Sequence, residues 1–427
     1  MTTAQRRTLI AAALGWALDA FDVMLYAIVV AHLMRDLGMS KGQAGFLNTL
    51  TLLASGIGGV LFGFIADRIG RTRALTFSIL TYSICSFASG LAQSVLVLAV
   101  IRFILGLGMG GEWNTGATLV AESWPTHLRA KAISIVQSSW AIGYAAAALV
   151  AGVLLRYYSW RVVFFVGIAP ALCTYWILRE VPESEMWRTR AQTAGSLRAE
   201  APQTNAPIEQ VRVAGEMMEL FRGRYALSTF ALLLMNFFGM FAWWGMFTWL
   251  PAYLSLPVAQ GGRGFDLPFL HMTWLPLSTT TVLLIFLNIC GMFPGYFSFG
   301  WAADALGRKP AFILYTAAAA ALVPIYAAAR SPIAIMLLGA LLAFFGTGFF
   351  SGSGIIASEI YPTRVRARAL GFTYNGARAL SSVSPAIIGA VGEAHGLGSA
   401  FYLCSAAFAM AAVGALLVPE TRGRELV

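Results

Sequence analysis

The sequence has 427 residues, of which 58% are hydrophobic and only 11% are charged. Soluble domains carry about 25% charged residues, so this composition excludes an ordinary soluble enzyme or binding module and predicts a membrane protein. The formal net charge of +10 would suit a nucleic-acid-binding protein. The positions of the basic residues favour a different explanation, which is given below.

Apolar runs of about 20 residues or more recur along the whole chain, and each is long enough to cross a hydrocarbon layer of about 30 Å as a helix. They do not alternate as the strands of a membrane β-barrel would. The fold class is therefore an all-α membrane protein with twelve transmembrane helices. The predicted spans are 8–34, 44–66, 73–93, 95–121, 131–155, 160–180, 223–254, 273–303, 310–329, 332–358, 368–393 and 397–418.

Most Lys and Arg residues fall in the loops on the side of the two termini, as Arg68, Arg71, Arg129 and Lys131 illustrate. By the positive-inside rule, this bias predicts that both termini lie in the cytoplasm. The basic charge is then explained by topology and by attraction to anionic lipid, so no nucleic-acid partner is expected. We expect a monomer in the cytoplasmic (inner) membrane whose partners are the lipid bilayer and a small molecule.

An internal repeat divides the chain into two similar halves. Three pairs of segments recur at one constant separation: "GFIADRIGRTR" from Gly63 and "GWAADALGRKP" from Gly300, "ESWPTHLRAKA" from Glu122 and "EIYPTRVRARA" from Glu359, and "PES" from Pro182 and "PET" from Pro419. Two homologous six-helix units in parallel are typical of secondary transporters. The predicted organisation is an N-terminal bundle over 1–187, a polar cytoplasmic linker over 188–222 and a C-terminal bundle over 223–427.

These motifs resemble the major facilitator superfamily, in which a G-x-x-x-D-R-x-G-R loop lies between spans two and three. The resemblance implies two pseudo-symmetric six-helix bundles and transport by alternating access, without enzymatic activity. The "DAFD" stretch of the first span and "RFILGLGMGGEW" of the fourth resemble the proton-coupled symporters of sialate, lactate and aromatic acids. This narrower resemblance implies H⁺ as the coupling ion and no bound cofactor.

Residues that recur in both halves are expected to serve the shared conformational cycle. The glycines are expected to permit tight turns and close helix approach, and the charged residues to pair with one another or with helix ends. In the family that the chain resembles, such pairs hold the inner side closed. A simpler reading is that the basic residues only fix topology. The predicted latch comprises Gly63, Asp67, Arg68, Gly70, Arg71, Glu122 and Arg129, with Gly300, Asp304, Gly307, Arg308, Glu359 and Arg366 in the second half.

Five ionisable residues inside spans have no counterpart in the other half: Asp19, Asp22, Arg102, Glu112 and Arg378. Charged residues at membrane depth are functional candidates by default. A rise of 1.5 Å per residue puts Asp22 and Arg102 both about 20 Å above the inner face, so we expect them to pair.

Asp19 lies one turn nearer the cytoplasm than Asp22, and Glu112 lies lower still. The charge state of a carboxylate in a low-dielectric cavity depends on whether an arginine lies beside it, which suits a proton carrier. We predict proton coupling by Asp19, Asp22 and Glu112. The alternatives are a static Asp22–Arg102 pair and a structural role for Glu112.

Arg378 has no acidic partner within the spans of the second half, so we predict that it binds a substrate carboxylate. The alternative is a pair with an acid of the first half. Aromatic and amide side chains at similar depth are typical of a small-ligand site, although each aromatic ring could instead serve packing. The predicted substrate-binding residues are Arg102, Arg378, Tyr374, Asn375, Trp243, Trp244, Asn236, Asn288, Gln137 and Trp140.

The function favoured by these patterns is proton-coupled symport of a small carboxylate, with exporters and symporters of a neutral solute or sugar as alternatives. A channel is disfavoured because single, asymmetric charges replace the ring of like groups that a pore would need. An enzyme is disfavoured because no nucleophile–base pair or metal-ligand spacing appears. The Gly-rich runs lack the Lys-Ser/Thr of a phosphate-binding loop, so the energy source is expected to be an ion gradient.

Overall fold

The computed structural model describes residues 2–184, 187–188, 220–264, 277–361 and 363–422. At positions 67, 114, 121, 126–127, 129–130, 224, 363–368 and 370 only the backbone is described. All regular secondary structure within these ranges is helical. Most of the predicted linker lies outside the described residues, so its boundaries stay a prediction.

The first half of the chain forms six spans. Their helices are α1 (Thr3–Leu37), α2 (Lys41–Ile69), α3 (Arg71–Ser89), α4 (Val95–Ser123), α5 (Thr126–Tyr157), α6 (Trp160–Val166) and α7 (Ala169–Glu180). The sixth span is broken between α6 and α7 because Gly167 and Ile168 separate them and Pro170 stands in the first turn of α7. A proline is tolerated in a first turn, where its missing N–H is not needed.

The second half also forms six spans. Its helices are α10 (Gly223–Ser255), η1 (Val258–Gln260), α11 (Thr279–Phe286), η3 (Leu287–Met292), α12 (Phe293–Leu306), α13 (Arg308–Ala328), α14 (Pro332–Ile360), α15 (Thr363–Ser381), α16 (Ser384–His395) and α17 (Leu397–Leu416). The span α11–η3–α12 contains a π-helical turn, η3, followed by Pro294. The span α15–α16 is interrupted between Ser381 and Ser384, shortly before Pro385.

The twelve predicted spans are confirmed, each by one helix or by consecutive helices. Ten of these segments are long and apolar enough to cross a membrane by length and composition. The other two are α3, which is rich in Ser and Thr, and the interrupted α15–α16, which begins with several arginines. Their polar content is tolerated because both helices pack against neighbours of the same bundle, α4 for α3 and α10 for α15.

Local sequence signals fix the sharp turns between consecutive spans. Helix α1 ends at Gly38, whose φ of +62° is easily reached only by glycine. Two residues later Ser40 begins α2 with a capping box, in which its hydroxyl accepts from the Gln43 N–H and the Gln43 side chain accepts from the Ser40 N–H. Gly70 and Gly307 make the equivalent turns of the two halves with φ of +102° and +106°. The predicted tight turns at these two repeat positions are confirmed.

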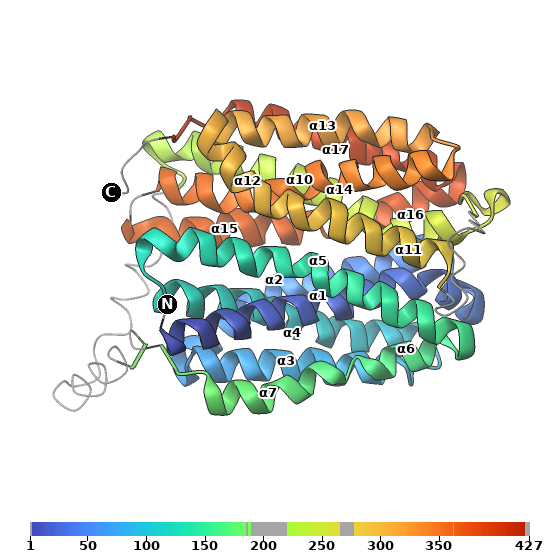
Figure 1. The fold of residues 1–427 in the computed structure, drawn as a ribbon, viewed down its shortest axis with the longest axis horizontal. Helices are drawn as coiled ribbons and strands as arrows, with labels where there is room; N and C mark the ends of the chain where they lie inside the picture. Colours follow the sequence, from blue (N-terminus) through green and yellow to red (C-terminus); the bar gives the residue numbers. More distant parts are fainter. Residues whose placement is uncertain (1, 185–186, 189–219, 265–276, 362, 423–427) are drawn as a thin grey trace.

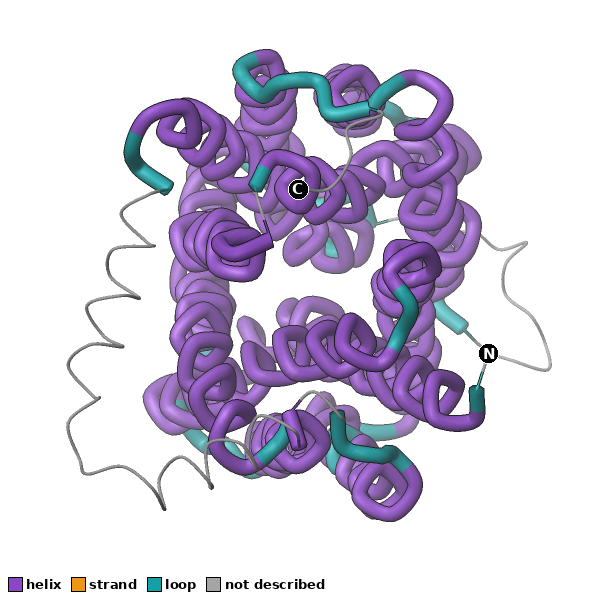
Figure 2. Tube along the Cα trace, turned by 90° about the vertical axis from the view of Figure 1, so that its left-hand side faces the viewer, coloured by secondary structure: helices purple, strands orange, loops and turns teal. Residues whose placement is uncertain are grey.

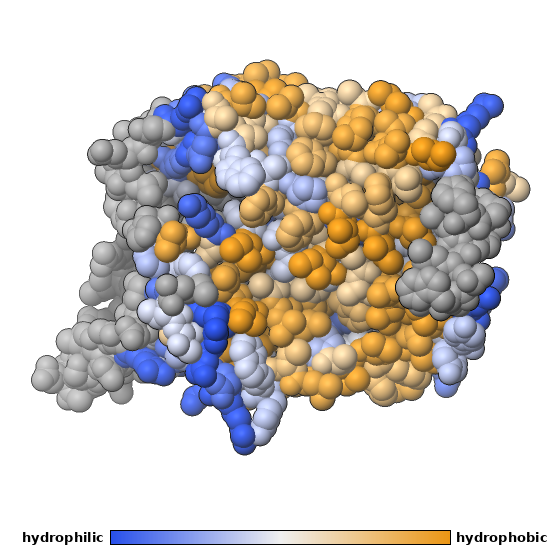
Figure 3. Space-filling model, viewed as in Figure 1, coloured by the Kyte–Doolittle hydropathy of each residue, from blue (hydrophilic) through white to orange (hydrophobic). Residues whose placement is uncertain are grey.

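The helices run side by side along one axis, with α1–α7 on one side and α10–α17 on the other (Figure 1). Both chain ends lie at the same end of the molecule, which we call the terminal end, and Figure 2 looks onto it. We call the opposite end the distal end. Hydrophobic side chains cover the middle of the visible face and hydrophilic ones gather towards its two ends (Figure 3), as expected of a surface that meets lipid.

The two bundles meet along three sets of helices: α2 packs on α15 and α16, α5 on α11 and α12, and α1 on α10. The contact between α2 and α16 is close, because a Cβ added to Gly45 would lie 2.2 Å from the carbonyl oxygen of Pro385. Further along α2, a Cβ at Gly63 would meet no described atom within 4 Å. The same holds for Gly300 of α12, so the predicted close helix approach at these two glycines is not seen in this conformation.

Polar contacts between the bundles concentrate at the distal end. The ammonium of Lys41 donates to the carbonyl oxygens of Gln260 (2.9 Å) and Gly392 (3.3 Å). The Glu393 carboxylate accepts from the N–H of Gly42 (3.3 Å), and one turn deeper the buried Asn48 amide donates to Thr248 (2.9 Å). The described contacts therefore hold the distal end closed.

We predict that Lys41→Gln weakens this closure. The substitution removes the charged donor from two carbonyl groups, and hydrogen bonds to charged groups contribute about 1.5–3 kcal/mol each. We expect the ratio of distal-open to distal-closed molecules to rise by about tenfold. Spin labels at Gln93 and Arg330, two exposed loop positions at the distal end, would report it as a new long-distance population.

The matched control is Arg35→Gln, which removes an exposed guanidinium at the same end that pairs with Asp36 of its own helix at 3.6 Å. This control should leave the distance distribution unchanged. An unchanged distribution in Lys41→Gln as well would show that the Lys41 contacts do not hold the distal end closed.

Candidate functional site

A cavity lies between the two bundles and receives side chains from both. Its lining comprises Trp16, Gln137 and Trp140 of the first half and Met240, Trp243, Trp244, Tyr296, Phe350, Tyr374 and Arg378 of the second. These residues come from α1, α5, α10, α12, α14 and α15. Six of the predicted substrate-binding residues line it: Arg378, Tyr374, Trp243, Trp244, Gln137 and Trp140.

Indole rings fill most of this cavity. The Trp140 ring lies 4.7 Å from that of Trp16, 5.9 Å from that of Trp243 and 6.0 Å from that of Trp244, measured between centroids. Tilted and edge-to-face pairs at such distances are favourable for aromatic rings. The cavity volume is only about 20 Å³, so the site is contracted around its rings in this conformation.

Arg378 provides the positive charge of the cavity lining. It stands near the end of α15, its side chain is only 4% exposed, and its Nε and one terminal nitrogen have no hydrogen-bond partner among the described residues. Its charge acts on both Asp19 and Glu112, which face it from the first half. The guanidinium is therefore near two carboxyl groups, but no ion pair within 4 Å joins it to either one in the described part of the chain.

The two carboxyl groups reach this region from different helices. Both oxygens of Asp19 on α1 are buried without a hydrogen-bond partner among described residues. Glu112 comes from α4 and packs against α1, where a Cβ added to Gly15 would lie 2.5 Å from its Oε1. A glycine at position 15 is therefore what lets the Glu112 side chain approach α1 beside Asp19.

Asp22 and Arg102 are close in the first bundle but do not form the predicted ion pair. Asp22 accepts a hydrogen bond from Ser86 of α3 at 2.9 Å. The Arg102 guanidinium instead lies over the ring of Tyr26, 4.3 Å from its centroid, with the Phe164 ring at 5.1 Å. The prediction of direct pairing is wrong for this conformation, because Ser86 binds one carboxylate oxygen of Asp22 and aromatic faces hold the Arg102 cation.

Several predicted substrate-binding residues are not part of the cavity lining. Arg102 is buried within the first bundle, and the Asn236 and Asn288 amides donate to the carbonyl oxygens of Thr373 (3.3 Å) and Leu284 (2.9 Å). Asn375 is half-buried next to Tyr374 but is also absent from the lining. Position along a span does not show which way a side chain points around the helix, so these residues could not be separated from those of the lining by sequence alone.

Sequence reasoning missed four residues that line the cavity: Trp16, Met240, Tyr296 and Phe350. Trp16 could have been found, because it stands one turn before Asp19 on the same face of α1. Tyr296 follows the π-helical turn, which rotates the helix beyond it and so hides the side-chain direction from a regular helical period. Met240 and Phe350 carry no local signal that separates them from packing residues.

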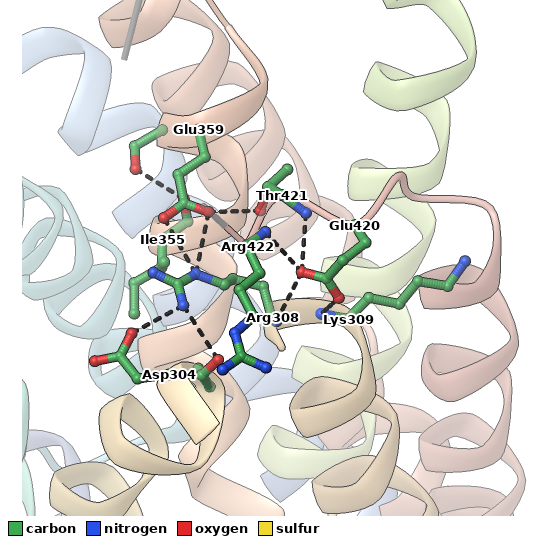
Figure 4. A network of polar contacts seen from close by, with 10 residues as sticks. Asp304, Arg308, Lys309, Ile355, Glu359, Glu420, Thr421 and Arg422 are labelled. Carbon is green, nitrogen blue, oxygen red and sulfur yellow. Dashed lines mark hydrogen bonds and ion pairs between the residues drawn. The ribbon is translucent and has the colours of Figure 1, made fainter. Parts of the chain in front are cut away.

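The repeat motifs form a similar polar cluster in each bundle at the terminal end. In the first half, Arg71 donates to Glu122 (3.4 Å) and to the Ala66 carbonyl (2.9 Å). In the second, Arg308 donates to Glu359 (3.2 Å), to Asp304 (2.8 Å) and to the Ala303 carbonyl (3.2 Å) (Figure 4). Each described cluster lies within one bundle, so neither joins the bundles in this conformation.

Some of the predicted latch cannot be placed in these clusters. The side chains of Asp67, Arg129 and Arg366 lie outside the described residues. Arg68 is exposed at the end of α2. The part of the latch made by Arg71, Glu122, Arg308, Asp304 and Glu359 is brought together as expected, and its role in closing the terminal end stays a prediction.

Two further acids, Glu183 and Glu420, complete the clusters. The Glu183 carboxylate accepts from the backbone N–H groups of Arg71 (2.8 Å) and Thr72 (3.2 Å) at the start of α3. Glu420 accepts from the corresponding N–H groups of Arg308 (3.0 Å) and Lys309 (3.1 Å) at the start of α13. Carboxylates are stabilising at helix N-termini. In the sequence, both glutamates could have been found from the repeated "PES" and "PET" segments, in which they occupy the same position.

We predict that Glu420→Gln lowers stability at neutral pH by about 1 kcal/mol or less, because Glu420 is exposed. Burial tends to raise the pKa of Glu420, but backbone N–H donors from Arg422, Arg308, Lys309 and Thr421 outweigh it and hold the pKa below its usual range. A lowered pKa contributes stability above the unfolded-state value and loses it as the pH falls. The difference from wild type should therefore shrink below about pH 4.

Thermal unfolding of the purified protein at pH 7 and pH 4 measures this effect. Glu183→Gln should likewise lower stability at pH 7, because Glu183 accepts from the N–H groups at the start of α3. Glu180→Gln is the control, since Glu180 forms a half-exposed ion pair with Arg7 (2.6 Å) and caps no helix. A Glu420→Gln deficit that is equal at both pH values would contradict the proposed helix-end role.

Two bundles of six spans, joined at the distal end around a cavity with buried charges, define a membrane transport protein. The chain belongs to the Major Facilitator Superfamily, whose sequence pattern matches residues 12–276 and 267–426. It is therefore a transporter and not an enzyme, as the sequence motifs predicted.

Known proteins similar to the chain match it over nearly its whole length. It is 32% identical to the "Probable 4-methylmuconolactone transporter" of Cupriavidus pinatubonensis, over 98% of this chain and 91% of the relative. It is 30% identical to the niacin transporter NiaP of Acinetobacter baylyi, over 97% of this chain and 93% of the relative. A structure of the xylose transporter XylE from E. coli, titled a partially occluded inward open conformation, shares the fold with a TM-score of 0.76 at 19% identity and full coverage of both chains.

Proposed function

We propose that this protein is a proton-coupled symporter of a small organic carboxylate. The observation that carries the proposal is Arg378, a buried guanidinium that lines the cavity with nitrogen atoms lacking a partner among described residues. An unpaired buried cation costs several kcal/mol. A ligand carboxylate would relieve that cost with two parallel hydrogen bonds, whereas a neutral solute would not.

Asp19 and Glu112 supply the proposed proton step. In the empty cavity, the buried positive charge of Arg378 favours a negative charge on a carboxyl group close to it. When a substrate carboxylate binds Arg378, it neutralises that positive charge, and one of the two acids takes up a proton in compensation. Substrate and proton therefore enter the cavity together, which is the requirement for symport. Asp22, hydrogen-bonded to Ser86 beside Arg102, is a second proton-binding candidate.

The orientation is also part of the proposal. Arg and Lys residues concentrate at the terminal end, which supports a cytoplasmic location for both termini in a bacterial inner membrane. The closed distal end then faces outward. The compounds in the names of the two relatives, niacin and 4-methylmuconolactone, are both small ring acids, which supports a ring carboxylate as cargo.

We predict that Arg378→Ala weakens carboxylate binding by at least about 30-fold, because losing one partner of a buried charge pair costs about 2–5 kcal/mol. Nicotinate should raise the melting temperature of the wild type and leave that of the variant unchanged. Nicotinamide, its neutral amide, should have little effect on either protein. A shift of equal size in Arg378→Ala, or with nicotinamide, would show that this arginine does not bind the carboxylate.

Proton coupling is tested in proteoliposomes with Asp19→Asn and Asp22→Asn. We expect the variant that lacks the proton-carrying acid to lose uptake driven by an inward proton gradient while retaining exchange of internal for external substrate, since exchange needs no net proton movement. Asp36→Asn is the control, because Asp36 is half-exposed at the distal end, where it accepts from Trp160. Gradient-driven uptake at the wild-type rate in both variants would refute the assignment of these acids.

A further inference from the structure

Three tryptophans of the cavity are unusual in leaving their indole N–H groups without a partner. Trp16, Trp140 and Trp243 are 5%, 3% and 1% exposed, and no described residue accepts from their Nε1. An indole nitrogen can only donate, and buried donors are almost always paired in native proteins. An unpaired buried donor needs an explanation.

Other buried tryptophans of the chain show that this is a property of the cavity. Trp124 donates to the Gln5 carbonyl (3.1 Å), Trp160 to Asp36 (2.9 Å) and Trp249 to the Pro385 carbonyl (2.8 Å). All three lie outside the cavity lining. The fold therefore satisfies buried indole groups where they serve packing, and leaves them unsatisfied where they face the site.

The unpaired donors belong to one neighbourhood. The Trp140 ring contacts both the Trp16 and the Trp243 rings, and the three come from α1, α5 and α10 of the two bundles. Arg378 on α15 adds further unpaired donors to the same lining. Gln137 and Tyr374 can each donate and accept, so they add donors as well as acceptors to this lining. The lining thus offers more donors than acceptors.

The excess of donors indicates a second property of the ligand besides its negative charge. Arg378 can bind one carboxylate, which leaves the indole N–H groups still in need of an acceptor. The contracted space between the rings admits a flat body more readily than a bulky one, because flat unsaturated groups stack on indole faces.

Resting on the proposed function, we propose that the cargo is a flat carboxylate with a second hydrogen-bond acceptor, which the Trp16, Trp140 and Trp243 N–H groups bind. The acceptor is a ring nitrogen, a carbonyl or hydroxyl oxygen, or a second carboxylate. The cavity then binds such acids more tightly than acids of the same charge and shape that lack the second acceptor. Sites that hydrogen-bond a substrate group reject analogues without that group, because their own polar atoms are left unpaired.

Two matched pairs of acids test the proposal on the purified full-length protein. Nicotinate and benzoate differ in one ring nitrogen, and cis,cis-muconate and sorbate differ in a second carboxylate. Calorimetric titration should give, in at least one pair, about tenfold tighter binding of the acceptor-bearing acid. In at least one of Trp16→Phe, Trp140→Phe and Trp243→Phe, that preference should fall to within about twofold while affinity for the plain acid is retained.

Trp249→Phe is the matched control, because it removes a buried indole N–H that is already bound to a carbonyl outside the cavity. It should lower the melting temperature and leave the preference unchanged. Three independent cavity variants keep the test decisive if one of them fails to fold. Equal affinity for both members of each pair in the wild type would overturn this proposal and leave the proposed function intact. Failure of all four acids to bind would overturn both.

Discussion

A buried guanidinium next to two carboxyl groups, with no ion pair to either, is the interaction on which the rest of this structure depends. A charge in the membrane interior must be compensated, yet no ion pair within 4 Å joins Arg378 to Asp19 or Glu112 in the described part of the chain. The loose arrangement has a structural origin, because the acids belong to one bundle and the arginine to the other. Any relative movement of the bundles therefore changes the electrostatic environment of all three groups together.

The two polar clusters at the terminal end show a different use of charge. Each joins helices of a single bundle. In both, an arginine (Arg71 or Arg308) binds a glutamate near the end of another helix (Glu122 or Glu359). A second glutamate accepts from N–H groups at a helix N-terminus. The positive-φ turns at Gly70 and Gly307 present the helix-starting N–H groups to that second glutamate in the same way. Rigid bundles are a requirement for rocking motions about a central site. The described clusters thus join helices within each half and do not join the two halves to each other.

Much of the fold could be predicted from the sequence because its determinants are local. Apolar length located the spans, and the repeat located the turns at Gly70 and Gly307. The choice of side-chain partners is not local. Asp22 and Arg102 were placed at the correct depth, but Ser86 on α3 and the Tyr26 ring compete for them, and a depth estimate says nothing about these competitors.

Residues of the cavity lining could be predicted where their chemistry set them apart from packing residues. Arg378 stood out as an unbalanced charge and Trp140 as an aromatic ring near polar groups, and both line the site. Asn236 and Asn288 looked equivalent in the sequence, yet their amides satisfy backbone carbonyls within the bundle. Tyr296 was hidden by the π-helical turn before it, because an added residue in one turn changes which face a later side chain occupies.

The distal contact between α2 and α16 places each charge at the electrically unfavourable pole of its own helix. Lys41 is the first residue of α2, where the positive pole repels a cation, and Glu393 stands in the last turn of α16, where the negative pole repels an anion. The facing helix end offsets this repulsion, because Lys41 donates to the Gly392 carbonyl near the end of α16 and Glu393 accepts from the Gly42 N–H at the start of α2. Separation of these helices would leave each charge at the unfavourable end of its own helix, so the contact between α2 and α16 favours a closed distal end.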